Sequence, residues 1–466
     1  MNGRDGMTSR WSRRQALGLG GLVAGGVLLG GVPAAGADPA AAILDGLRQP
    51  VFPRRQFDIT RFGAVGDGTT DCTDAFRAAV DACHRAGGGR VVVPEGDFLT
   101  GAIHLRSNVN LHVTGTIRFH TDPAKYLPVV MTRWEGTECY NYSPLVYAFG
   151  QRDVAITGSG VLDGQGRRGP WESWYANSGP QGADQRELRR MGEEGVPVEQ
   201  RVFGAGHYLR PTMIEFYRCQ NVLVSGVTVI DPPMWTVHPV LSRNVVVSGV
   251  TVHSYLYNTD GCDPECCTNV HIADCRFDTN DDCVSIKSGR DADGHRVGVP
   301  STNIVVERCK FAGRWGGLAI GSEMSGGVRG VYARDCEINP TDFPGSYPVK
   351  YPLYIKTNKL RGGYVRDVHL RNFTGGGVER EALYVILDYN NQVGTRPVDV
   401  SGITVEGMVL DGVRRAVWLN GLATDPIRDV RIRDSHFTNV TTPTNTVNHT
   451  ENLRYTDVTV NGNPIT

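Results

Sequence analysis

A pattern that recurs along the middle of the chain constrains the fold more than any other feature. Its copies are NVLVSGVTV from Asn221, NVVVSGVTV from Asn244, NVHIADCRF from Asn269, NIVVERCKF from Asn303 and GVYARDCEI from Gly330. Apolar and polar residues alternate within each copy, which is the period of a β-strand. Strands that recur roughly every 20 to 30 residues, with no helix between them, predict a parallel β-helix in which each coil stacks on the previous one.

Other repeat architectures fit the pattern less well. The signatures of leucine-rich repeats and of β-propellers are missing from the copies. Fainter copies begin at Asp153 before the clear ones and at Val398 and Ile427 after them. We therefore predict an all-β fold, a single parallel β-helix domain over residues 56–466.

The repeats also account for the eleven cysteines of the chain. The seventh residue of the five copies is, in order, Val227, Val250, Cys275, Cys309 and Cys336. Because a free cysteine behaves as a small apolar residue, we predict a buried column of side chains rather than disulfides or metal ligands. The chain has no CxxC pair to support a zinc site. A local disulfide among Cys262, Cys266 and Cys267 remains open.

The segment TDAFRAAVDACHRAGGG, residues 73–89, has apolar residues at helical spacing and ends in glycines. The open end of a β-helix would expose core residues and unpaired backbone groups to water. We therefore expect a short N-terminal helix that caps the first coil.

The N-terminus has the features of an export signal. Arg13 and Arg14 form a twin-arginine pair, an apolar run covers 17–32, and Ala35-Gly36-Ala37 resembles a cleavage site. The run is diluted by glycine and falls short of the roughly 20 apolar residues that span a membrane. We expect a Tat signal over 1–37, a linker over 38–55, and a secreted protein without stable membrane association once the signal is removed.

Charge excludes some classes of partner. Lysine and arginine number 48, and aspartate and glutamate number 49. No overall field therefore attracts nucleic acid or an anionic membrane, and ionic recognition must be local. A capped β-helix buries its core without a second chain, so we expect a monomer.

Acidic residues crowd together in YNTDGCDPECCTNVHIADCRFDTNDDCVSIKSGRD, residues 257–291. Asp260 lies in one coil, and Asp281 and Asp282 lie in the next. Asparagine, aspartate and glycine are also common in plain turns, but two such segments one coil apart, each before an apolar strand, favour a site. Crowded carboxylates raise the proton affinity of one member, which keeps an acid protonated beside ionised neighbours. Asp263 is interpreted as a structural residue of the turn around Asp260.

The chain resembles the polygalacturonase family, glycoside hydrolase family 28, whose members are right-handed, pectate-lyase-like β-helices. The resemblance rests on FDITRFGAVGDGTTD near the start, then NTDGCDP, NDDCVSIKSGRD, GGLAIGSEMSGGV and YIKTNK in the family's order. It implies inverting hydrolysis of a pectin-type polysaccharide, with Asp281 as general acid and with Asp260 and Asp282 activating water. Stacking should place the residues about 5 Å apart along the axis, and we expect the carboxyls to reach the roughly 6.5 to 9.5 Å typical of inverting enzymes. No metal or organic cofactor is implied.

Two positions depart from the family's pattern. Trp315 stands where the family has histidine in Gly-His-Gly, and Tyr354 stands where it has arginine in Arg-Ile-Lys, whereas Lys356 remains. Tyrosine cannot bind a carboxylate through two parallel hydrogen bonds as arginine does. We therefore expect an altered substrate: a substituted or mixed pectin such as rhamnogalacturonan or xylogalacturonan, or another acidic or neutral glycan.

Further residues are candidates for substrate binding. They are Asn258 beside the acidic cluster, Lys287 in SIKSGRD, Arg314 beside Trp315, and His238 in PPMWTVHPV. The long segment 167–204 contains Trp171, Trp174 and Tyr175, and we expect it to narrow one end of a groove and favour exo-action.

Two other functions stay open on the same fold. A polysaccharide lyase needs a calcium site and a base that removes a proton beside a carboxylate, and its products absorb in the ultraviolet. A non-catalytic carbohydrate-binding β-helix would bind without turnover. The three aspartates favour hydrolysis, which needs only carboxylates and water.

Overall fold

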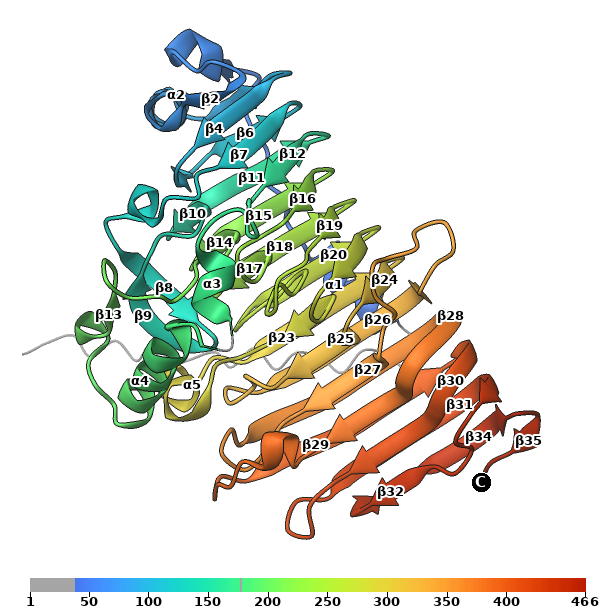
Figure 1. The fold of residues 1–466 in the computed structure, drawn as a ribbon. Helices are drawn as coiled ribbons and strands as arrows, with labels where there is room; N and C mark the ends of the chain where they lie inside the picture. The colour runs from blue at the N-terminus through green and yellow to red at the C-terminus, as the bar shows by residue number, and fades with distance from the viewer. Residues whose placement is uncertain (1–37, 177) are drawn as a thin grey trace, which may run out of the picture. The chain divides into compact units, whose positions relative to one another are not determined.

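The computed structural model describes residues 38–176 and 178–466, so the expected signal at 1–37 lies outside the described residues. From β1 (Gln56–Asp58) onward, the chain winds into the right-handed parallel β-helix that the sequence predicts (Figure 1). A short helix, α1 (Pro39–Asp45), lies within the segment that was expected to be a linker. No helix among the described residues is long and apolar enough to cross a membrane.

Each coil contributes strands to three faces, and strands on one face pair in parallel with those of the next coil. The first face contains β3 (Gly89–Val93), β6 (Val109–Val113), β11 (Arg152–Gly158), β15 (Gln220–Ser225), β18 (Arg243–Ser248), β20 (Thr268–Ala273) and β23 (Ser301–Glu307). The second contains β4 (Asp97–Thr100), β7 (Thr116–Phe119), β12 (Val161–Asp163), β16 (Thr228–Ile230), β19 (Thr251–His253), β21 (Arg276–Thr279) and β24 (Lys310–Gly313).

The third face is interrupted in the middle. It begins with β5 (Ile103–His104), β10 (Val146–Phe149), β14 (Ile214–Tyr217) and β17 (Val237–Val240), and resumes with β22 (Val284–Ile286), β25 (Gly316–Gly321) and β27 (Tyr351–Lys356). Between β17 and β22 the ladder continues through isolated bridges, in which Cys262 pairs with Val237 and Val284, and Glu265 pairs with Val240 and Lys287. The acidic segments lie at this interruption.

The last coils use long strands that bend from one face to another. They are β26 (Val328–Ile338), β28 (Gly363–Ile386), β29 (Val398–Glu406), β30 (Val409–Asn420), β31 (Ile427–Val440) and β34 (Arg454–Val460). β28 pairs with β27 on the third face and with β26 and β29 on the first. The short strand β32 (Thr446–Asn448) extends the third face beyond β30.

The repeated asparagine explains why the copies begin alike. Asn221, Asn244, Asn269 and Asn303 have left-handed backbone conformations, with φ of 56°, 54°, 59° and 58°. Their side-chain amides form a ladder, in which each Nδ2 donates to the Oδ1 of the residue one coil earlier, Asp153 for Asn221, at 2.9 to 3.3 Å. Asparagine tolerates this conformation better than most residues, so it marks the corner where each coil turns.

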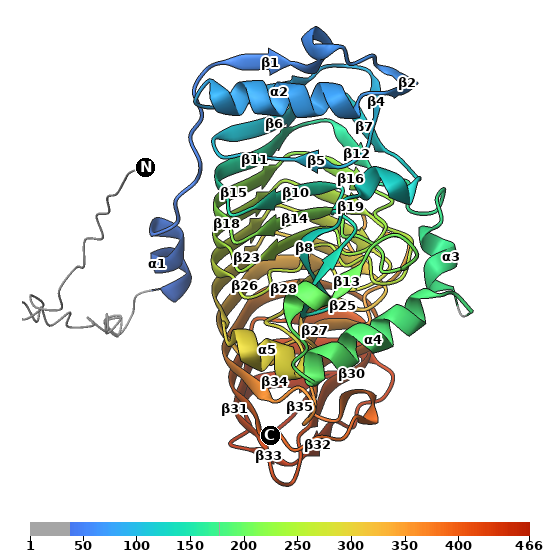
Figure 2. The ribbon, with the colours of Figure 1, turned by 90° about the vertical axis from the view of Figure 1, so that its left-hand side faces the viewer.

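The core and the N-terminal cap follow the sequence. The predicted column of Val227, Val250, Cys275, Cys309 and Cys336 is buried, and all eleven cysteines are free and buried, which excludes the disulfide that had remained open. Helix α2 (Thr73–Arg85) buries Phe76 and Val80 and lies across the first coils, as expected (Figure 2). Its first amide is held by the Asp71 carboxylate, whose Oδ1 accepts the Thr73 N–H at 2.9 Å.

Two insertions build one wall beside the third face. One is the antiparallel hairpin of β8 (Val130–Trp134) and β9 (Thr137–Asn141), which β13 (Val202–Phe203) extends. The other is the long segment after β12, which contains α3 (Trp171–Tyr175) and α4 (Gln181–Glu193). Figure 2 shows α4 beside α5 (Asp291–Val297), and the two helices are in contact.

Candidate active site

The structure brings the three predicted aspartates together. Asp260 lies just before the bridge at Cys262, and Asp281 and Asp282 lie between β21 and β22 in the next coil. The Gly261 N–H donates to the backbone carbonyl of Asp282 at 3.0 Å, which fixes the two segments side by side. One carboxylate oxygen from each aspartate lies within 4.8 Å of those of the other two.

The carboxylates of the trio lie closer together than expected. The closest oxygens lie nearer together than the roughly 6.5 to 9.5 Å typical of inverting glycosidases. The physical reason is the coil spacing. Asp260 and Asp282 each lie two residues before paired positions, Cys262 and Val284, so their backbones are one strand spacing apart. Both side chains also project to the same side, so the carboxylates lie close together instead of spreading.

Burial and mutual repulsion raise the pKa of Asp281 well above its usual value, the repulsion coming from Asp260 and Asp282. Burial also raises the pKa of Asp260, and Asp282 adds to this effect, although the Lys287 ammonium opposes it. Asp281 is partly exposed, whereas Asp260 and Asp282 are buried. The main-chain N–H of Asn258 donates to Oδ2 of Asp281 at 3.2 Å. Asp281 is thus the member of the trio best placed to carry a proton to a ligand.

Asp282 is held from two sides. Its Oδ1 accepts the Gly316 N–H at 2.7 Å, and its Oδ2 accepts a hydrogen bond from Lys356 Nζ at 2.8 Å. A Cβ atom added to Gly316 would lie 2.9 Å from Oδ1 of Asp282. Both oxygens of Asp282 are therefore engaged, and the glycine makes that arrangement possible.

Lys287 lies buried among three carboxylates. Its Nζ is 3.4 Å from Asp260, 3.4 Å from Asp263 and 3.6 Å from Glu323, and it lies over the ring of Trp235. Burial and the nearby Asp260 raise the pKa of Asp263 well above its usual value. Asp263 is fully buried and does not line the cleft, in keeping with a structural interpretation.

A cleft of about 650 Å³ is lined by Asp260 and Asp281 of the trio, whereas Asp282 is fully buried and does not line it. Of the predicted substrate-binding residues, five line it: Asn258, Lys287, Trp315, Tyr354 and Lys356. Arg314 does not; its guanidinium donates to Oδ1 of Asn280 at 3.3 Å and lies over the rings of Tyr257 and Tyr347.

The prediction that His238 binds substrate is wrong. Its side chain is fully buried, outside the cleft, with Nε2 2.9 Å from Glu265 and Nδ1 3.4 Å from Glu215. Burial lowers the pKa of His238, but the two carboxylates more than offset this, and the net pKa is raised. A histidine enclosed by two glutamates stabilises buried charge and cannot reach a sugar.

Aromatic rings continue the cleft toward the C-terminal coils. Tyr354 pairs in register with Tyr384, and Tyr384 with Trp418, so the three stack along the outer side of the third face. The ring centroids of Tyr354 and Tyr384 lie 5.4 Å apart, and those of Tyr384 and Trp418 lie 6.0 Å apart. Flat apolar faces with one polar atom each suit sugar rings.

The opposite end of the cleft is lined by a charged cluster of Glu135, Arg290 and Glu323, in which sequence reasoning missed Glu135. Glu135, in the turn of the β8–β9 hairpin, accepts hydrogen bonds from Gln185 Nε2 at 2.9 Å and Arg189 Nη2 at 2.6 Å. Arg290 Nη1 lies 3.4 Å from Glu135 and 2.8 Å from Glu323. Burial raises the pKa of Glu323, but Arg290 and Lys287 outweigh it and hold the pKa well below its usual value. Arg290 and Glu323 had a signal, because they lie in the quoted motifs NDDCVSIKSGRD and GGLAIGSEMSGGV, whereas Glu135 had none.

Comparison with known proteins decides the family. Residues 204–459 match the family described as glycosyl hydrolases family 28. The chain belongs to glycosyl hydrolases family 28. As a member of this family it is a glycoside hydrolase, as the sequence predicts.

Relatives and solved structures agree with this assignment. A probable polygalacturonase of Vitis vinifera is 32% identical over 392 residues, covering 80% of this chain and 72% of the relative. An exo-poly-alpha-D-galacturonosidase of Dickeya chrysanthemi is 26% identical, covering 72% of this chain and 58% of the relative. The structure of a hyperthermoactive exopolygalacturonase from Thermotoga maritima is similar with a TM-score of 0.87 and 45% identity, over 91% of this chain and 96% of that one.

Proposed function

We propose that this family 28 member is an exo-acting hydrolase that removes terminal sugars from a galacturonan-type pectin. The observation that carries the proposal is the cleft itself: the three aspartates lie between an aromatic track on one side and the Glu135–Arg290–Glu323 cluster on the other. Glu323 is linked to Asp260 through the single side chain of Lys287, so this cluster lies close to the trio, and in the proposal it leaves room for one sugar. The 45% identity to an exopolygalacturonase supports the same mode.

In this proposal Asp281 is the general acid. Its raised pKa keeps it protonated at mildly acidic pH, so it can protonate the glycosidic oxygen as the bond to the anomeric carbon breaks. Asp260 and Asp282 hold a water molecule, which attacks the anomeric carbon and gives up a proton to one of them. Since a water attacks directly, the configuration of that carbon inverts.

The hydrogen bonds that Asp282 accepts support attack by water rather than by the Asp282 carboxylate. A carboxylate that bonds to Gly316 and Lys356 through both oxygens is a poor covalent nucleophile. The short separation of the carboxyls argues the other way, because it lies near the roughly 5 to 5.5 Å of retaining enzymes. Proton NMR of the first-formed product decides: we expect the anomer opposite to that of the substrate.

Substrate recognition is proposed to rest on Lys356, whose ammonium lines the cleft near Tyr354 and Tyr389. Buried Asp282 takes one of its three hydrogens, which leaves donors for a uronate carboxylate. A substituted galacturonan is the second candidate, since Trp315 and Tyr354 line the cleft where the family has a histidine and an arginine.

The test is a panel of polygalacturonate, rhamnogalacturonan, xylogalacturonan and neutral galactan, with products sized at early times. We expect monomer from polygalacturonate, with reducing sugar appearing long before viscosity falls. Products that absorb in the ultraviolet would instead indicate a lyase, and binding without any reducing sugar would indicate a carbohydrate-binding protein.

We further propose that the protein acts outside the cell as a monomer after Tat export. The support is the twin-arginine segment and a chain whose cysteines need no oxidation, because Tat substrates fold before export. Replacing Arg13 and Arg14 by lysine should keep the protein inside the cell, and gel filtration should give the mass of one chain.

A further inference from the structure

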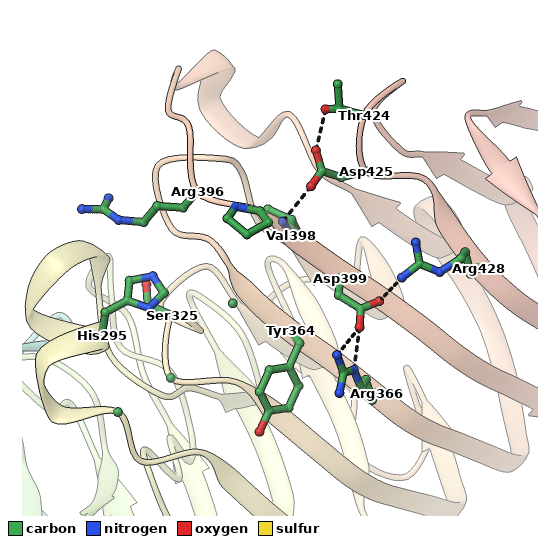
Figure 3. Close-up of a pocket in the computed structure, with 14 residues that line it drawn as sticks. His295, Ser325, Tyr364, Arg366, Arg396, Val398, Asp399, Thr424, Asp425 and Arg428 are labelled. Carbon is green, nitrogen blue, oxygen red and sulfur yellow. Dashed lines mark hydrogen bonds and ion pairs between the residues drawn. The ribbon is translucent and has the colours of Figure 1, made fainter.

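A second cavity, of about 810 Å³, lies apart from the cleft and shares no lining residue with it. It is formed by the C-terminal end of α5, the turn after β25, and the first residues of β28, β29 and β31 (Figure 3). The hydrolytic mechanism uses none of these residues. The cavity therefore needs a separate explanation.

The side chains that line the cavity carry an excess of positive charge. Arg366 from β28 and Arg428 from β31 both bind the single carboxylate of Asp399, at 2.5 Å and 2.6 Å (Figure 3). One carboxylate between two guanidinium groups leaves one positive charge and several N–H donors without a partner among the described residues. The other charges at the cavity are matched, since Arg396 binds Glu193 and Asp425 binds Lys359.

The strand register extends this cationic surface along the axis. Arg329 pairs with Arg366 in the next coil, Arg366 with Ser401, and Ser401 with Arg428, so the arginines lie on one line of the first face. Arg329 is exposed, and its guanidinium makes no ion pair with any other described residue. Successive coils are about 5 Å apart, so this line offers cations along the axis rather than at one point.

A buried, unpaired hydroxyl also belongs to a residue that lines the cavity. Ser325 lines it, is only 3% exposed, and its Oγ has no hydrogen-bond partner in the part of the chain that the structure describes. A buried hydroxyl without a partner is unfavourable, so such a group calls for a polar partner. Tyr364 adds an aromatic ring beside Arg366.

We propose that this cavity is a second binding site for a uronate sugar of an acidic glycan, outside the catalytic cleft. The carboxylate binds Arg366 and Arg428, whose planar N–H groups match it, and the sugar hydroxyls reach Ser325 and Tyr364. The choice of a uronate rests on the proposed function. The site would keep the polymer at the enzyme between cleavage events.

The test is the number of galacturonate-binding sites per chain. Calorimetric titration of the full chain carrying Asp281→Asn with galacturonate trimer should give two sites per chain, and adding Arg366→Gln and Arg428→Gln should remove one or weaken it about tenfold. The matched control is Arg433→Gln, because Arg433 is as exposed as Arg366 and binds one carboxylate, Glu406, at 2.7 Å outside the cavity. A neutral galactose trimer should not occupy the second site.

The outcomes are distinct. One site in both proteins, or equal behaviour of the Arg366→Gln/Arg428→Gln and Arg433→Gln variants, overturns the proposal. Occupation by galacturonate monomer as tightly as by trimer supports the carboxylate site and assigns it to the free product instead of the polymer. Hydrolysis of a galacturonate dimer by the otherwise native arginine variants should be unchanged. Failure of the native chain to cleave any galacturonan would refute the proposed function, and the second site would then appear as a single site that Arg366→Gln and Arg428→Gln remove.

Discussion

Lys356 Nζ donates to Oδ2 of Asp282 at 2.8 Å, although the two residues belong to coils that are separated by another coil. The contact is possible because the intervening coil presents Gly316 at that point, and its N–H binds the other oxygen of Asp282. The glycine, the lysine and the aspartate therefore form one unit, in which the absence of a side chain is as important as the two charges.

Gly316→Ala should disturb this unit without breaking the fold. The new Cβ would lie 2.9 Å from Oδ1 of Asp282, closer than a carbon atom tolerates, so the carboxylate must move. We expect a loss of kcat of about 100-fold with a smaller change in melting temperature. Gly317→Ala is the control, because its nearest neighbours, a Phe311 ring carbon and the Pro352 carbonyl oxygen, are 3.3 Å away and neither belongs to the trio. Equal activity of the two variants would contradict the role of Gly316.

Asp281→Asn should lower kcat about 1,000-fold and leave KM nearly unchanged, because it removes the proton donor and keeps the shape of the side chain. It should also raise the melting temperature at pH 7 by a few degrees. The folded pKa of Asp281 is raised, so the folded state binds more protons than the unfolded state, and ionisation destabilises the fold as pH rises. The gain in stability should disappear near pH 4, where the unfolded chain is also protonated.

The control for Asp281→Asn is Asp411→Asn, an exposed carboxylate whose pKa is lowered by hydrogen bonds from Thr438 and Asn439. It should keep full activity, and its melting temperature should not rise at pH 7. A rise equal to that of Asp281→Asn would show that the gain is unrelated to the raised pKa.

Lys287→Met should move the acidic limb of the kcat/KM profile to higher pH. The lysine ammonium lowers the pKa of Asp260, so its removal raises that pKa further and the base ionises later. Lys310→Met, which breaks an exposed pair with Asp342, should leave the profile unchanged.

Asp263→Asn tests whether Asp263 is structural or catalytic. If Asp263 is structural and protonated, the amide should preserve activity. A loss of activity as large as that of Asp281→Asn would make Asp263 catalytic.

The sequence predicts the coils, the cap and the aspartate trio because each depends on a periodic or local pattern. A strand repeat fixes which residues stack, so Asp260 and Asp282 follow from counting. The helix α2 follows from its apolar spacing. The buried column from Val227 to Cys336 follows from aligned copies.

The wall and the true place of His238 could not be predicted in this way. Glu135 and Arg189 are 54 residues apart in the sequence and form a hydrogen bond. Both lie in insertions outside the coil repeat, so the repeat spacing does not predict their contact. His238 follows a Pro-Pro turn and Trp235, which suggested exposure. Instead it pairs with Glu215 in the coil before, and only the register shows this. The separation of the carboxyls depends on side-chain directions, which coil stacking alone does not give.

Titration of thiols checks the cysteine column. All eleven cysteines are free and buried, and burial raises the pKa of Cys83 to about 11 and that of Cys219 to about 12. The native protein should therefore react with almost no aromatic disulfide reagent at pH 8, and eleven thiols should appear on unfolding. Nine thiols after unfolding would mean that one disulfide forms after all, most directly between two of Cys262, Cys266 and Cys267.

Opening the wall should change the mode of cleavage. Tyr175 lines the cleft and stacks on Tyr257 at 5.4 Å, and Arg189 holds Glu135 in place at 2.6 Å. Tyr175→Ala combined with Arg189→Ala removes bulk and frees the hairpin tip, so the polymer can extend past the trio and internal bonds become accessible. We expect oligomers as well as monomer among early products, and viscosity that falls sooner for the same reducing sugar. The control is Arg190→Ala, on the same helix but paired with Glu187 on the exposed side, and it should release monomer alone. Oligomers from this control, or no oligomers from the double variant, would show that the wall does not determine exo-action.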